Sequence, residues 1–299
     1  MSHVPVLLHE SIRLLDPKPG EFIIDATVDG GGLAAAILEK ISPNGLLLGI
    51  DWDRRMIEKA QERIAEILKL QFPISEVVLV NDNFARLPEI LKERNLGQAD
   101  GLVLDLGFSS EQLENFGRGF SFQRDEPLIM TYSNDVKPVR EILKELSENE
   151  LAEIIRKFGE ERYAKRIAYA IKQQEKIKPI ETTKELVDAV IPAVPKNYEQ
   201  GRIHPATRTF QALRIYANKE LENLETVLKN LPEILKVGGR AAIISFHSLE
   251  DRLVKNYFRD YKKVEKLTIL TKKPITASEE EIKENPRTRS AKLRCAIRR

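Results

Sequence analysis

A glycine-rich segment that follows a short apolar run is the part of this sequence best suited to bind a cofactor. Residues Asp25-Ala-Thr-Val-Asp-Gly-Gly-Gly-Leu33 follow the apolar run Phe22-Ile23-Ile24, and Asp51 closes the next apolar run. Glycines at a strand-to-helix turn let the backbone approach a ligand closely, and an acidic residue about 20 positions later can accept hydrogen bonds from both hydroxyls of a ribose. The pattern predicts a nucleotide-cofactor site.

Two classes of cofactor fit this segment. Gly30-x-Gly32-x-x-Ala35 matches a dinucleotide fingerprint, but Asp29 is awkward beside a pyrophosphate and tolerable beside the sulfonium or amino group of S-adenosylmethionine. We therefore favour S-adenosylmethionine as the cofactor. The structural alternatives are that the glycines only make a tight turn and that Asp51 only caps a helix beginning near Arg54.

A second candidate site begins at the end of another apolar run, with Asp105-Leu-Gly-Phe-Ser-Ser-Glu-Gln-Leu113. The exocyclic amine of cytosine or adenine is a poor nucleophile because its lone pair is delocalised into the ring. Oriented acceptors and a well-aligned approach therefore matter more for its methylation than a strong base. Asp105, Ser109 and Ser110 are the candidate catalytic residues. The alternative is that Asp105 caps the following turn and the two serines only form it.

The segment Phe116-Gly-Arg-Gly-Phe-Ser-Phe122 combines one cation, two glycines and three aromatic rings. This composition suits stacking on an unpaired RNA base, with Arg118 and Phe120 as candidate contacts. Packing of the rings in a core is an equally good interpretation.

Two histidines lie in further polar segments that suit RNA. His204 and Arg208 belong to a segment that could contact phosphates or could simply pair with nearby glutamates. His247 follows an apolar run and could face the same edge of the sheet as the cofactor. The structural alternative is a helix cap at Ser248, with acidic residues in the first turn.

The end of the sequence is basic, although the net charge of the chain is only +2. Residues Asn285 to Arg299 carry six basic side chains and no acidic one, and Arg289 and Lys292 are candidate RNA contacts. Such a segment suits a polyanion, and a solvated tail is the alternative.

Composition limits the class of protein. The 299 residues are 42% hydrophobic and 31% charged, and no apolar run approaches the roughly 18 residues that a membrane span needs. The single cysteine, Cys295, excludes an internal disulfide, a multi-thiolate metal site and the usual zinc site of base deaminases. The first residues lack the basic and apolar regions of a signal peptide, so we expect a cytoplasmic protein that contacts no membrane. Transfer of a methyl group from S-adenosylmethionine requires no metal, and we expect none.

Strand-like and helix-like patterns alternate over the first hundred residues. This alternation predicts βαβ units and hence a parallel sheet in an α/β fold. The carboxyl ends of parallel strands meet at one edge of such a sheet, so Asp25, Asp51, the turn from Asn81 to Phe84 and Asp105 should share one rim. The expected strands are Phe22–Asp25, Leu46–Asp51, Val77–Val80 and Leu102–Asp105, and the expected helices are Leu33–Lys40, Arg54–Leu70 and Leu87–Arg94.

The alternation stops after Asp105 for about a hundred residues, where charged amphipathic helices are predicted between Val139 and Lys178. Residues 113–205 are therefore expected to form a helical insertion, a lid that recognises the substrate. Residues 1–112 and 206–299 should form one discontinuous domain. Its second part should contain a long helix from about Ala206 to Lys229, strands at Arg240–Ser245 and around Cys295, and a loop from Thr271 to Arg289.

Six segments in order over the whole chain resemble the signatures of the bacterial 16S ribosomal RNA (cytosine-N4) methyltransferases. The resemblance is specific because six ordered motifs are much harder to match by chance than one glycine loop. It implies a class I S-adenosylmethionine-dependent methyltransferase fold, Rossmann-like with a helical insert. It also implies N4-methylation of a decoding-centre cytidine of 16S rRNA within the small ribosomal subunit. The segments are His3–Glu10, Asp105–Leu113, Arg118–Phe122, His204–Arg214, Ser245–Asp251 and Arg289–Arg294.

The resemblance also implies cofactor contacts at seven positions, six of which match the family in residue type. They are Gly31, Gly32, Leu33, Asp51, Phe84, Asp105 and Gln112. By this carry-over Asp51 holds the ribose, Phe84 lies near the adenine, and Asp105 with Ser109 orients the amine.

The chain departs from the family pattern at four positions. Leu33 stands in place of a histidine, Asp29 in place of a glycine, and Ile129 and Thr131 in place of an aspartate and an arginine. Loss of both members of an ion pair can be neutral for folding, whereas loss of a catalytic or RNA-contacting pair lowers activity. The departures favour an alternative function, a catalytically impaired relative that acts as an rRNA-binding assembly factor. A nicotinamide oxidoreductase is the third hypothesis, and it requires tight binding of a dinucleotide.

Overall fold

The computed structural model describes residues 5–70, 75–107, 117–201 and 203–299, and these divide into two compact units. The first unit comprises Met1–Gly107 and Leu221–Arg299, and the second comprises Phe108–Glu220. The expected second boundary lay at residues 205 and 206, so the structure assigns about fifteen more residues to the helical unit. The reason is packing, since Phe210 and Leu213 belong to the helical unit's hydrophobic core.

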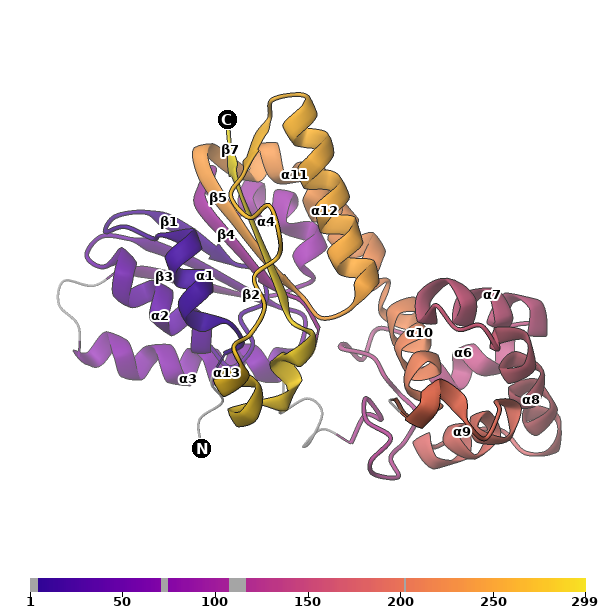
Figure 1. The fold of residues 1–299 in the computed structure, drawn as a ribbon. Coiled ribbons are helices and arrows are strands. Elements are labelled where there is room, and N and C mark those ends of the chain that lie inside the picture. Colours follow the sequence, from indigo (N-terminus) through magenta and orange to yellow (C-terminus); the bar gives the residue numbers. More distant parts are fainter. Residues whose placement is uncertain (1–4, 71–74, 108–116, 202) are drawn as a thin grey trace. The chain divides into compact units, whose positions relative to one another are not determined.

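The first unit is an α/β domain, as the alternation of patterns predicted (Figure 1). Its amino-terminal half confirms all four expected strands. In chain order this half contains α1 (Leu8–Leu15), β1 (Phe22–Asp25), α2 (Gly32–Ile41), β2 (Leu46–Asp51), α3 (Arg54–Leu70), β3 (Glu76–Asn81), η1 (Phe84–Arg86), α4 (Leu87–Glu93) and β4 (Ala99–Asp105). The carboxy-terminal half contains α11 (Glu220–Ile234), β5 (Leu235–Ser245), α12 (Ser248–Lys263), β6 (Leu267–Ile269), α13 (Glu279–Glu284), η4 (Pro286–Ser290) and β7 (Lys292–Arg298).

The strands form one seven-stranded sheet in the order β3-β2-β1-β4-β5-β7-β6. Strands β1 to β5 are parallel, and β7 runs antiparallel between β5 and β6. The chain moves outward from β1 to β3 and then crosses back to β4 on the other side of β1. This reversal makes the crevice between β1 and β4 the topological switch point, where open α/β sheets bind ligands at the carboxyl ends of their strands.

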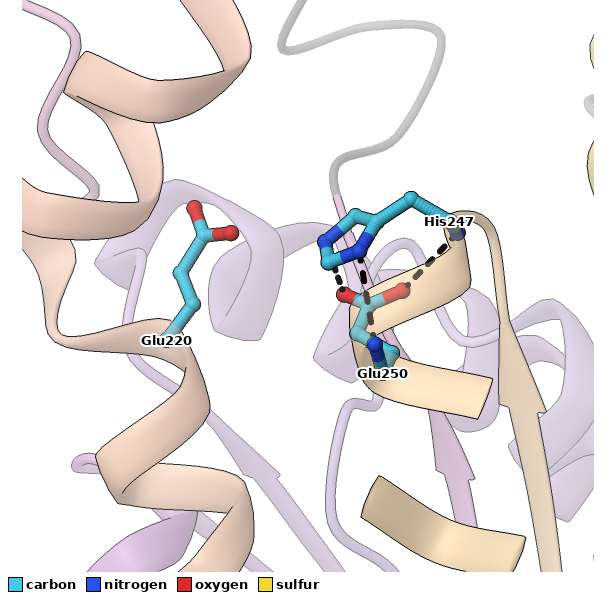
Figure 2. Close-up of side chains that lie close together, drawn as sticks. All are labelled: Glu220, His247 and Glu250. Carbon is cyan, nitrogen blue, oxygen red and sulfur yellow. Dashed lines mark hydrogen bonds and ion pairs between the residues drawn. The ribbon is translucent and has the colours of Figure 1, made fainter. Parts of the chain in front are cut away.

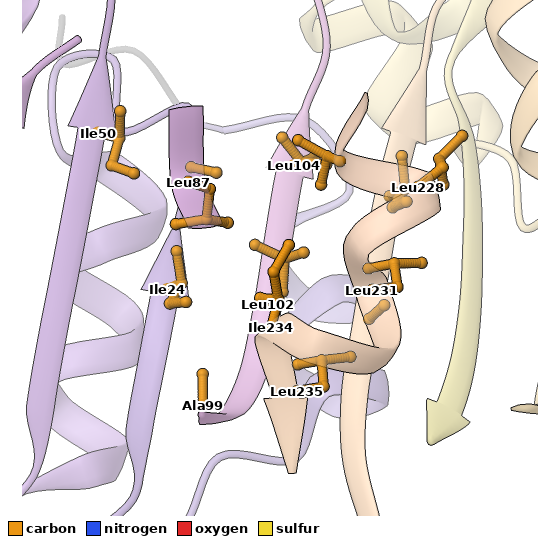
Figure 3. Close-up of a cluster of buried hydrophobic side chains, with 14 of the residues drawn as sticks. Ile24, Ile50, Leu87, Ala99, Leu102, Leu104, Leu228, Leu231, Ile234 and Leu235 are labelled. Atoms are coloured by element: carbon orange, nitrogen blue, oxygen red, sulfur yellow. The ribbon is translucent and has the colours of Figure 1, made fainter. Parts of the chain in front are cut away.

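Successive strand residues point to opposite faces of the sheet, and both faces are buried under helices. Ile24, Ile50 and Leu104 contribute to one cluster, which α4, α11 and α12 cover (Figure 3). Their neighbours Ile23 and Val103 contribute to the cluster on the opposite face, under α1, α2 and α3. The apolar alternation therefore fixes the register that brings the strand-end polar residues to one rim.

The second unit is helical, as expected. It contains α6 (Val139–Glu145), α7 (Glu148–Gly159), α8 (Ala164–Ile177), α9 (Thr183–Val190), η2 (Ile191–Ala193), η3 (Tyr198–Gly201) and α10 (Thr207–Asn218) around a core of its own. Ser147 with Glu150 and Thr182 with Glu185 form capping boxes that fix the starts of α7 and α9. No helix in the described parts of the chain is long and apolar enough to cross a membrane.

Two sequence expectations about the carboxy-terminal third are wrong. The long helix expected from about Ala206 to Lys229 is two helices, α10 and α11, because Lys219 adopts a left-handed conformation with φ 51° and ends α10. The expected loop from Thr271 to Arg289 contains a short helix, α13, whose first turn is capped by Ser278. Neither the left-handed residue nor the six-residue helix leaves a clear periodic signal in the sequence.

Gly159 provides a test of the helical unit's packing. A Cβ atom at this position would lie 2.5 Å from the carbonyl oxygen of Arg208, so α7 and α10 would have to separate. We expect Gly159→Ala to destabilise this unit by about 1–3 kcal/mol, measured as faster amide hydrogen exchange in α7 and α10 and a lower Tm. Gly97→Ala is the matched control, because a Cβ there meets no atom within 4 Å. Unchanged exchange in the Gly159→Ala variant would contradict the close contact of Gly159 with the backbone of α10.

Candidate functional site

Four polar residues lie at the carboxyl ends of adjacent strands, as predicted. Asp51 is paired in register with Asn81 at the ends of β2 and β3, and Asp25 ends β1 beside Val103 of β4. Asp105 ends β4, which lies next to β1 in the sheet. Residues from four separate parts of the sequence thus lie along one edge of the sheet, with Asp25 and Asp105 on either side of the switch point.

Thr27 is hydrogen-bonded to both aspartates nearest the switch point, Asp25 and Asp105. The backbone N–H of Thr27 donates to Asp25 Oδ1 at 3.3 Å, and the hydroxyl oxygen of Thr27 accepts a hydrogen bond from the backbone N–H of Asp105 at 2.7 Å. The short turn after β1 is therefore attached to the end of β4. Sequence reasoning missed Thr27, although its place two residues after a strand-end acid is a typical signal of an Asx turn.

The glycine loop adopts the left-handed conformations that its composition allows. Gly31 has φ 76° and precedes the first residue of α2, and a Cβ there would lie 3.1 Å from the Ala60 Cα atom. Asp29 also has a positive φ, 46°, a conformation that aspartate tolerates better than most side chains. The backbone explains why Asp29 can occupy a position where a glycine is usual, because both residue types reach this region.

Asp51 ties the glycine loop to the end of β2. Its Oδ2 accepts a hydrogen bond from the Asp29 N–H at 2.9 Å, and its Oδ1 accepts one from the Asp53 N–H at 2.8 Å. The side chain that accepts from the start of α3 is Asp53, whose Oδ1 lies 3.1 Å from the Arg55 nitrogen. Asp51 is therefore not the cap of α3, and each of its oxygens retains a lone pair for a further donor such as a ribose hydroxyl.

Burial and mutual repulsion make these carboxyl groups weak acids. Burial, with the nearby negative charge of Asp29, raises the pKa of Asp25 to about 7 and that of Asp51 to about 8. Burial also raises the pKa of Asp105 well above its usual value, and the charges of Asp29, Asp25 and Glu250 add to the effect. A cation placed among these groups would relieve the repulsion, whereas a pyrophosphate would increase it.

The site fits the cationic cofactor S-adenosylmethionine in three further respects. Asp25 Oδ2 and Asp105 Oδ1 are buried and have no hydrogen-bond partner among the described residues, so both are available to donors on a ligand. The N–H groups of the first turn of α2 lack helical partners and suit a carboxylate. Phe84, half-buried at the start of η1 after β3, places an aromatic ring beyond the same edge of the sheet.

Leu33 contributes to the loop differently from its neighbours. Its side chain is only 6% exposed and belongs to the hydrophobic cluster beneath α1, α2 and α3. Any contact of Leu33 with a cofactor would therefore involve its backbone. A Cβ on Gly32, in contrast, would lie 2.6 Å from Pro5, which shows how closely the amino-terminal segment covers the loop.

Comparison with known proteins agrees with this geometry. A profile of the MraW methylase family matches residues 1–299. The chain belongs to the MraW methylase family. It is 44% identical over 310 residues to the ribosomal RNA small subunit methyltransferase H of Trichlorobacter lovleyi, covering 98% of this chain and 97% of that protein. The proteins of the same name from Geotalea uraniireducens and Geobacter sulfurreducens are 45% and 43% identical, and the alignments cover 98% and 99% of this chain and 97% and 98% of those proteins.

Membership of this methylase family confirms the class I S-adenosylmethionine-dependent methyltransferase fold and the cofactor expected from the sequence. The chain is therefore an S-adenosylmethionine-dependent methyltransferase. The carboxylate rim and glycine loop of this methylase are the parts of the first unit that suit the cofactor.

His247 of the methylase is held by the first turn of α12, as Figure 2 shows. It is the N-cap residue, one position earlier than the cap considered at Ser248. Its Nδ1 accepts from the Glu250 N–H at 3.4 Å, and its Nε2 lies 3.1 Å from Glu250 Oε1. Glu250 in turn accepts from the backbone N–H groups of Phe246 and His247 and is almost fully buried. The helix-capping interpretation therefore describes the side chain of His247 in this structure.

The carboxy-terminal basic residues divide into paired and exposed ones. Arg294 forms a largely buried ion pair with Asp251 at 2.6 Å, and Lys292 lies 3.7 Å from the same carboxylate. Arg289 is exposed in η4. The segment is thus mostly a packed strand rather than a solvated tail, since Leu293, Cys295 and Ala296 of β7 are buried.

The candidate RNA contacts in the helical unit have partners within that unit. Phe120 is buried and stacks on Tyr132 with ring centroids 5.3 Å apart, which corresponds to the core-packing interpretation. Arg118 donates to the carbonyl oxygen of Thr131 and to Asn134. His204 is exposed and stacks on Phe122 at 4.6 Å. Arg208 lies 3.3 Å from Glu199, so the expected pairing with a glutamate is present.

Thr131 and Ile129 lie in a segment that is hydrogen-bonded to the end of α10. Thr131 is buried, and its hydroxyl donates to the carbonyl oxygen of Ser133. The next residue, Tyr132, donates its N–H to Asn218 Oδ1 at 3.0 Å, and Asn218 Nδ2 donates to the Met130 carbonyl at 2.8 Å. Neither departure leaves a buried charge, so the fold accommodates the loss of both family residues.

Three predicted site residues lie outside the described residues. They are Ser109, Ser110 and Gln112.

The raised pKa of Asp25 predicts a pH-dependent penalty on the stability of this methylase. An unfolded aspartate ionises near pH 4, but the folded protein holds this proton up to about pH 7. The penalty is therefore absent below pH 4, grows between pH 4 and 7, and is complete above pH 7. We expect the Tm of Asp25→Asn minus the Tm of the wild type to increase as pH rises from 4 to 7. Calorimetry in the absence of cofactor measures this difference. The exposed residue Glu66, changed to Gln, is the control. A Tm difference that does not vary with pH would refute the assignment.

The same groups predict how cofactor affinity depends on pH. Because the bound cation favours ionised carboxylates, S-adenosylmethionine should bind more tightly as pH rises from about 6 to 9, with release of protons into the buffer. Titration calorimetry in buffers of different ionisation enthalpy measures both quantities. Asp51→Asn should weaken binding and reduce the pH dependence. Proton uptake on binding would contradict this account.

Proposed function

We propose that this methyltransferase transfers a methyl group to the N4 atom of a decoding-centre cytidine in 16S ribosomal RNA. The names of its relatives support ribosomal RNA of the small subunit as the substrate class. Support for the amine acceptor comes from the motif that begins at Asp105 and from the six-motif resemblance. A cytoplasmic location follows from this substrate.

The observation that carries the proposal is the position of Asp105. It ends β4 at the switch point, its backbone is held by Thr27, and its Oδ1 is a buried acceptor with no partner among the described residues. An amino group attached to a pyrimidine ring has N–H donors and a delocalised lone pair. A fixed acceptor can hold such an amine and draw its lone pair out of conjugation as the new bond forms.

The cofactor supplies the methyl group, and residues of the chain bind the cofactor and orient the amine. When bound, S-adenosylmethionine provides an electrophilic methyl group on a positively charged sulfur. The proposed contacts are Gly31, Gly32 and the Leu33 backbone for the amino-acid part, Asp51 for the ribose, and Phe84 for the adenine, with Gln112 carried over from the family. Asp105 with Ser109 and Ser110 would orient the amine, and the raised pKa values should fall once the cation is present.

The helical insertion is proposed to recognise RNA. Recognition of a single cytidine requires an unstacked base and contacts to the surrounding backbone. Arg118, His204 and Arg208 lie in this unit, and His247, Arg289 and Lys292 lie in the other. Phe120 would take part through the segment that it anchors, because its own ring is buried.

The deciding experiment is methylation of small ribosomal subunits from cells that lack this modification. Purified protein is incubated with labelled S-adenosylmethionine, and the RNA is digested for nucleoside mass analysis. N4-methylcytidine at one position is the expected product. Cofactor binding and RNA binding without any methylated nucleoside would instead identify an assembly factor, the alternative that the departures at Asp29, Leu33, Ile129 and Thr131 raised.

Replacing Asp105 tests its role directly. Asp105→Asn should lower kcat by about 100-fold or more, because the amide cannot provide the same charged acceptor at either oxygen position. RNA affinity should be unchanged. Single-turnover methylation separates this effect from product release, and Glu66→Gln is the matched control with the same loss of one carboxylate. Near-normal single-turnover rates in Asp105→Asn would exclude this residue from the reaction.

A further inference from the structure

One face of α8 carries most of the exposed cations of that helix. The face consists of Arg162, just before the helix, and Lys165, Arg166, Tyr169, Lys172 and Lys176, and we refer to it as the α8 basic face. With 3.6 residues per turn, these six positions fall within about 120° of the helix circumference. The opposite side, with Ile167, Ala168 and Ile171, is buried in the core of the helical unit. The core therefore fixes the direction in which the basic face points.

An exposed tyrosine lies in the middle of this face. Tyr169 is 55% exposed, more than is usual for a large aromatic side chain. Lys165 precedes it by one helical turn, and Lys172 and Lys176 follow it on the same side. The face combines cations on both sides with a ring in the centre.

The charges on this face are largely uncompensated. Lys165 and Lys176 have no ion-pair partner among the described residues, and Lys172 donates to the carbonyl oxygen of Leu143. Arg162 and Arg166 lie over the Tyr163 ring, at 4.9 and 5.8 Å from its centroid. Among the residues that the structure describes, Glu199 is the one acid that pairs with the face, 4.0 Å from Arg162. The acid within α8, Glu175, accepts the Ile180 N–H.

Three other lysines of the helical unit are paired with acids. Lys137 pairs with Glu145, Lys184 with Asp188, and Lys178 with Glu185. Their surroundings are locally neutral although the side chains are exposed. The cations of the α8 basic face thus differ from these three lysines, whose charges are balanced by neighbouring acids.

We propose that the α8 basic face binds RNA, with its lysines and arginines on phosphates and Tyr169 stacked on an unpaired base. This inference rests on the proposed function, in that the RNA is the substrate of the methyltransferase. The distance from Lys165 to Lys176 along the helix is about 16 Å, which spans several phosphates of one strand. Cations that flank an exposed aromatic ring are the arrangement by which proteins hold single-stranded RNA. An acidic protein surface would match the charges but would not require the ring.

Two variants test the face against a control of equal charge. Lys165→Gln/Arg166→Gln/Lys176→Gln removes three cations of the face, and Lys137→Gln/Lys178→Gln/Lys184→Gln removes three paired cations of the same unit. Binding to protein-free 16S rRNA is measured from 50 to 300 mM salt, together with binding of S-adenosylmethionine and the kinetics of methylation. We expect the first variant to bind RNA about tenfold more weakly and its salt slope to fall by about 2. The control variant should change little, and both should bind cofactor normally.

Tyr169 provides an independent readout. Tyr169→Ala should weaken RNA binding about tenfold without changing the salt slope, because stacking releases no counterions, and Tyr169→Phe should restore the affinity. Tyr169→Ala should raise the KM for RNA and leave the single-turnover rate at saturating RNA unchanged, because Tyr169 is not one of the proposed reacting groups, and Tyr169→Phe should have the KM of the wild type.

The outcomes separate this inference from the proposed function. If both triple variants bind RNA equally, or if Tyr169→Ala binds like the wild type, the inference is wrong whether or not N4-methylcytidine is formed. If the first triple variant loses affinity for assembled subunits and keeps it for protein-free RNA, the face binds a ribosomal protein and the RNA assignment is wrong. If the wild type forms no N4-methylcytidine but the face still determines RNA affinity, the inference stands and the proposed function fails.

Discussion

The crowding of carboxyl groups at the switch point is the constraint on which the site depends. The sheet aligns the ends of β1, β2 and β4, and the three strand-end aspartates thereby lose water and lie within reach of the negative charge of Asp29. Such an arrangement is costly unless the groups hold protons or meet a cation. The segment after β1 offsets part of the cost, because the Thr27 N–H donates to Asp25 and the Asp29 N–H donates to Asp51. Cofactor choice, protonation and local stability therefore have one physical origin.

Much of this could be predicted from the sequence because the signals were local. Each of the strands β1, β2 and β4 is a short apolar run closed by an aspartate, and the βαβ spacing made a parallel sheet the simplest arrangement. The break between α10 and α11 could not be predicted in this way. Lysine is a good helix former, so nothing in the residue type at position 219 indicates the left-handed conformation that ends α10.

Side-chain roles were harder to predict than elements, since the same residue types serve packing and binding. Phe120 and His247 occur in segments rich in aromatic or polar residues, and only tertiary structure shows that one ring is buried and that the other caps a helix. Thr27 was overlooked because a single threonine after a strand carries no periodicity. Asp29 is a contrasting case. Aspartate tolerates a positive φ better than most residues, so the residue type alone could suggest that it fits a position where glycine is usual.

The hydrogen bonds between Asn218 and the segment at Met130 and Tyr132 bear on how the whole chain folds. β4 and β5 are neighbours in the sheet, yet Asp105 and its partner Ile244 are separated by the entire insertion, a closure that is entropically expensive and slow. Hydrogen bonds of Asn218 with Tyr132 and Met130 join positions 86 and 88 residues apart within the insertion, and so shorten the chain between the two strands. An insertion that folds first acts as a short tether, so the kinetic barrier to completing the sheet is set by the autonomy of the inserted unit rather than by the number of residues between the two strands.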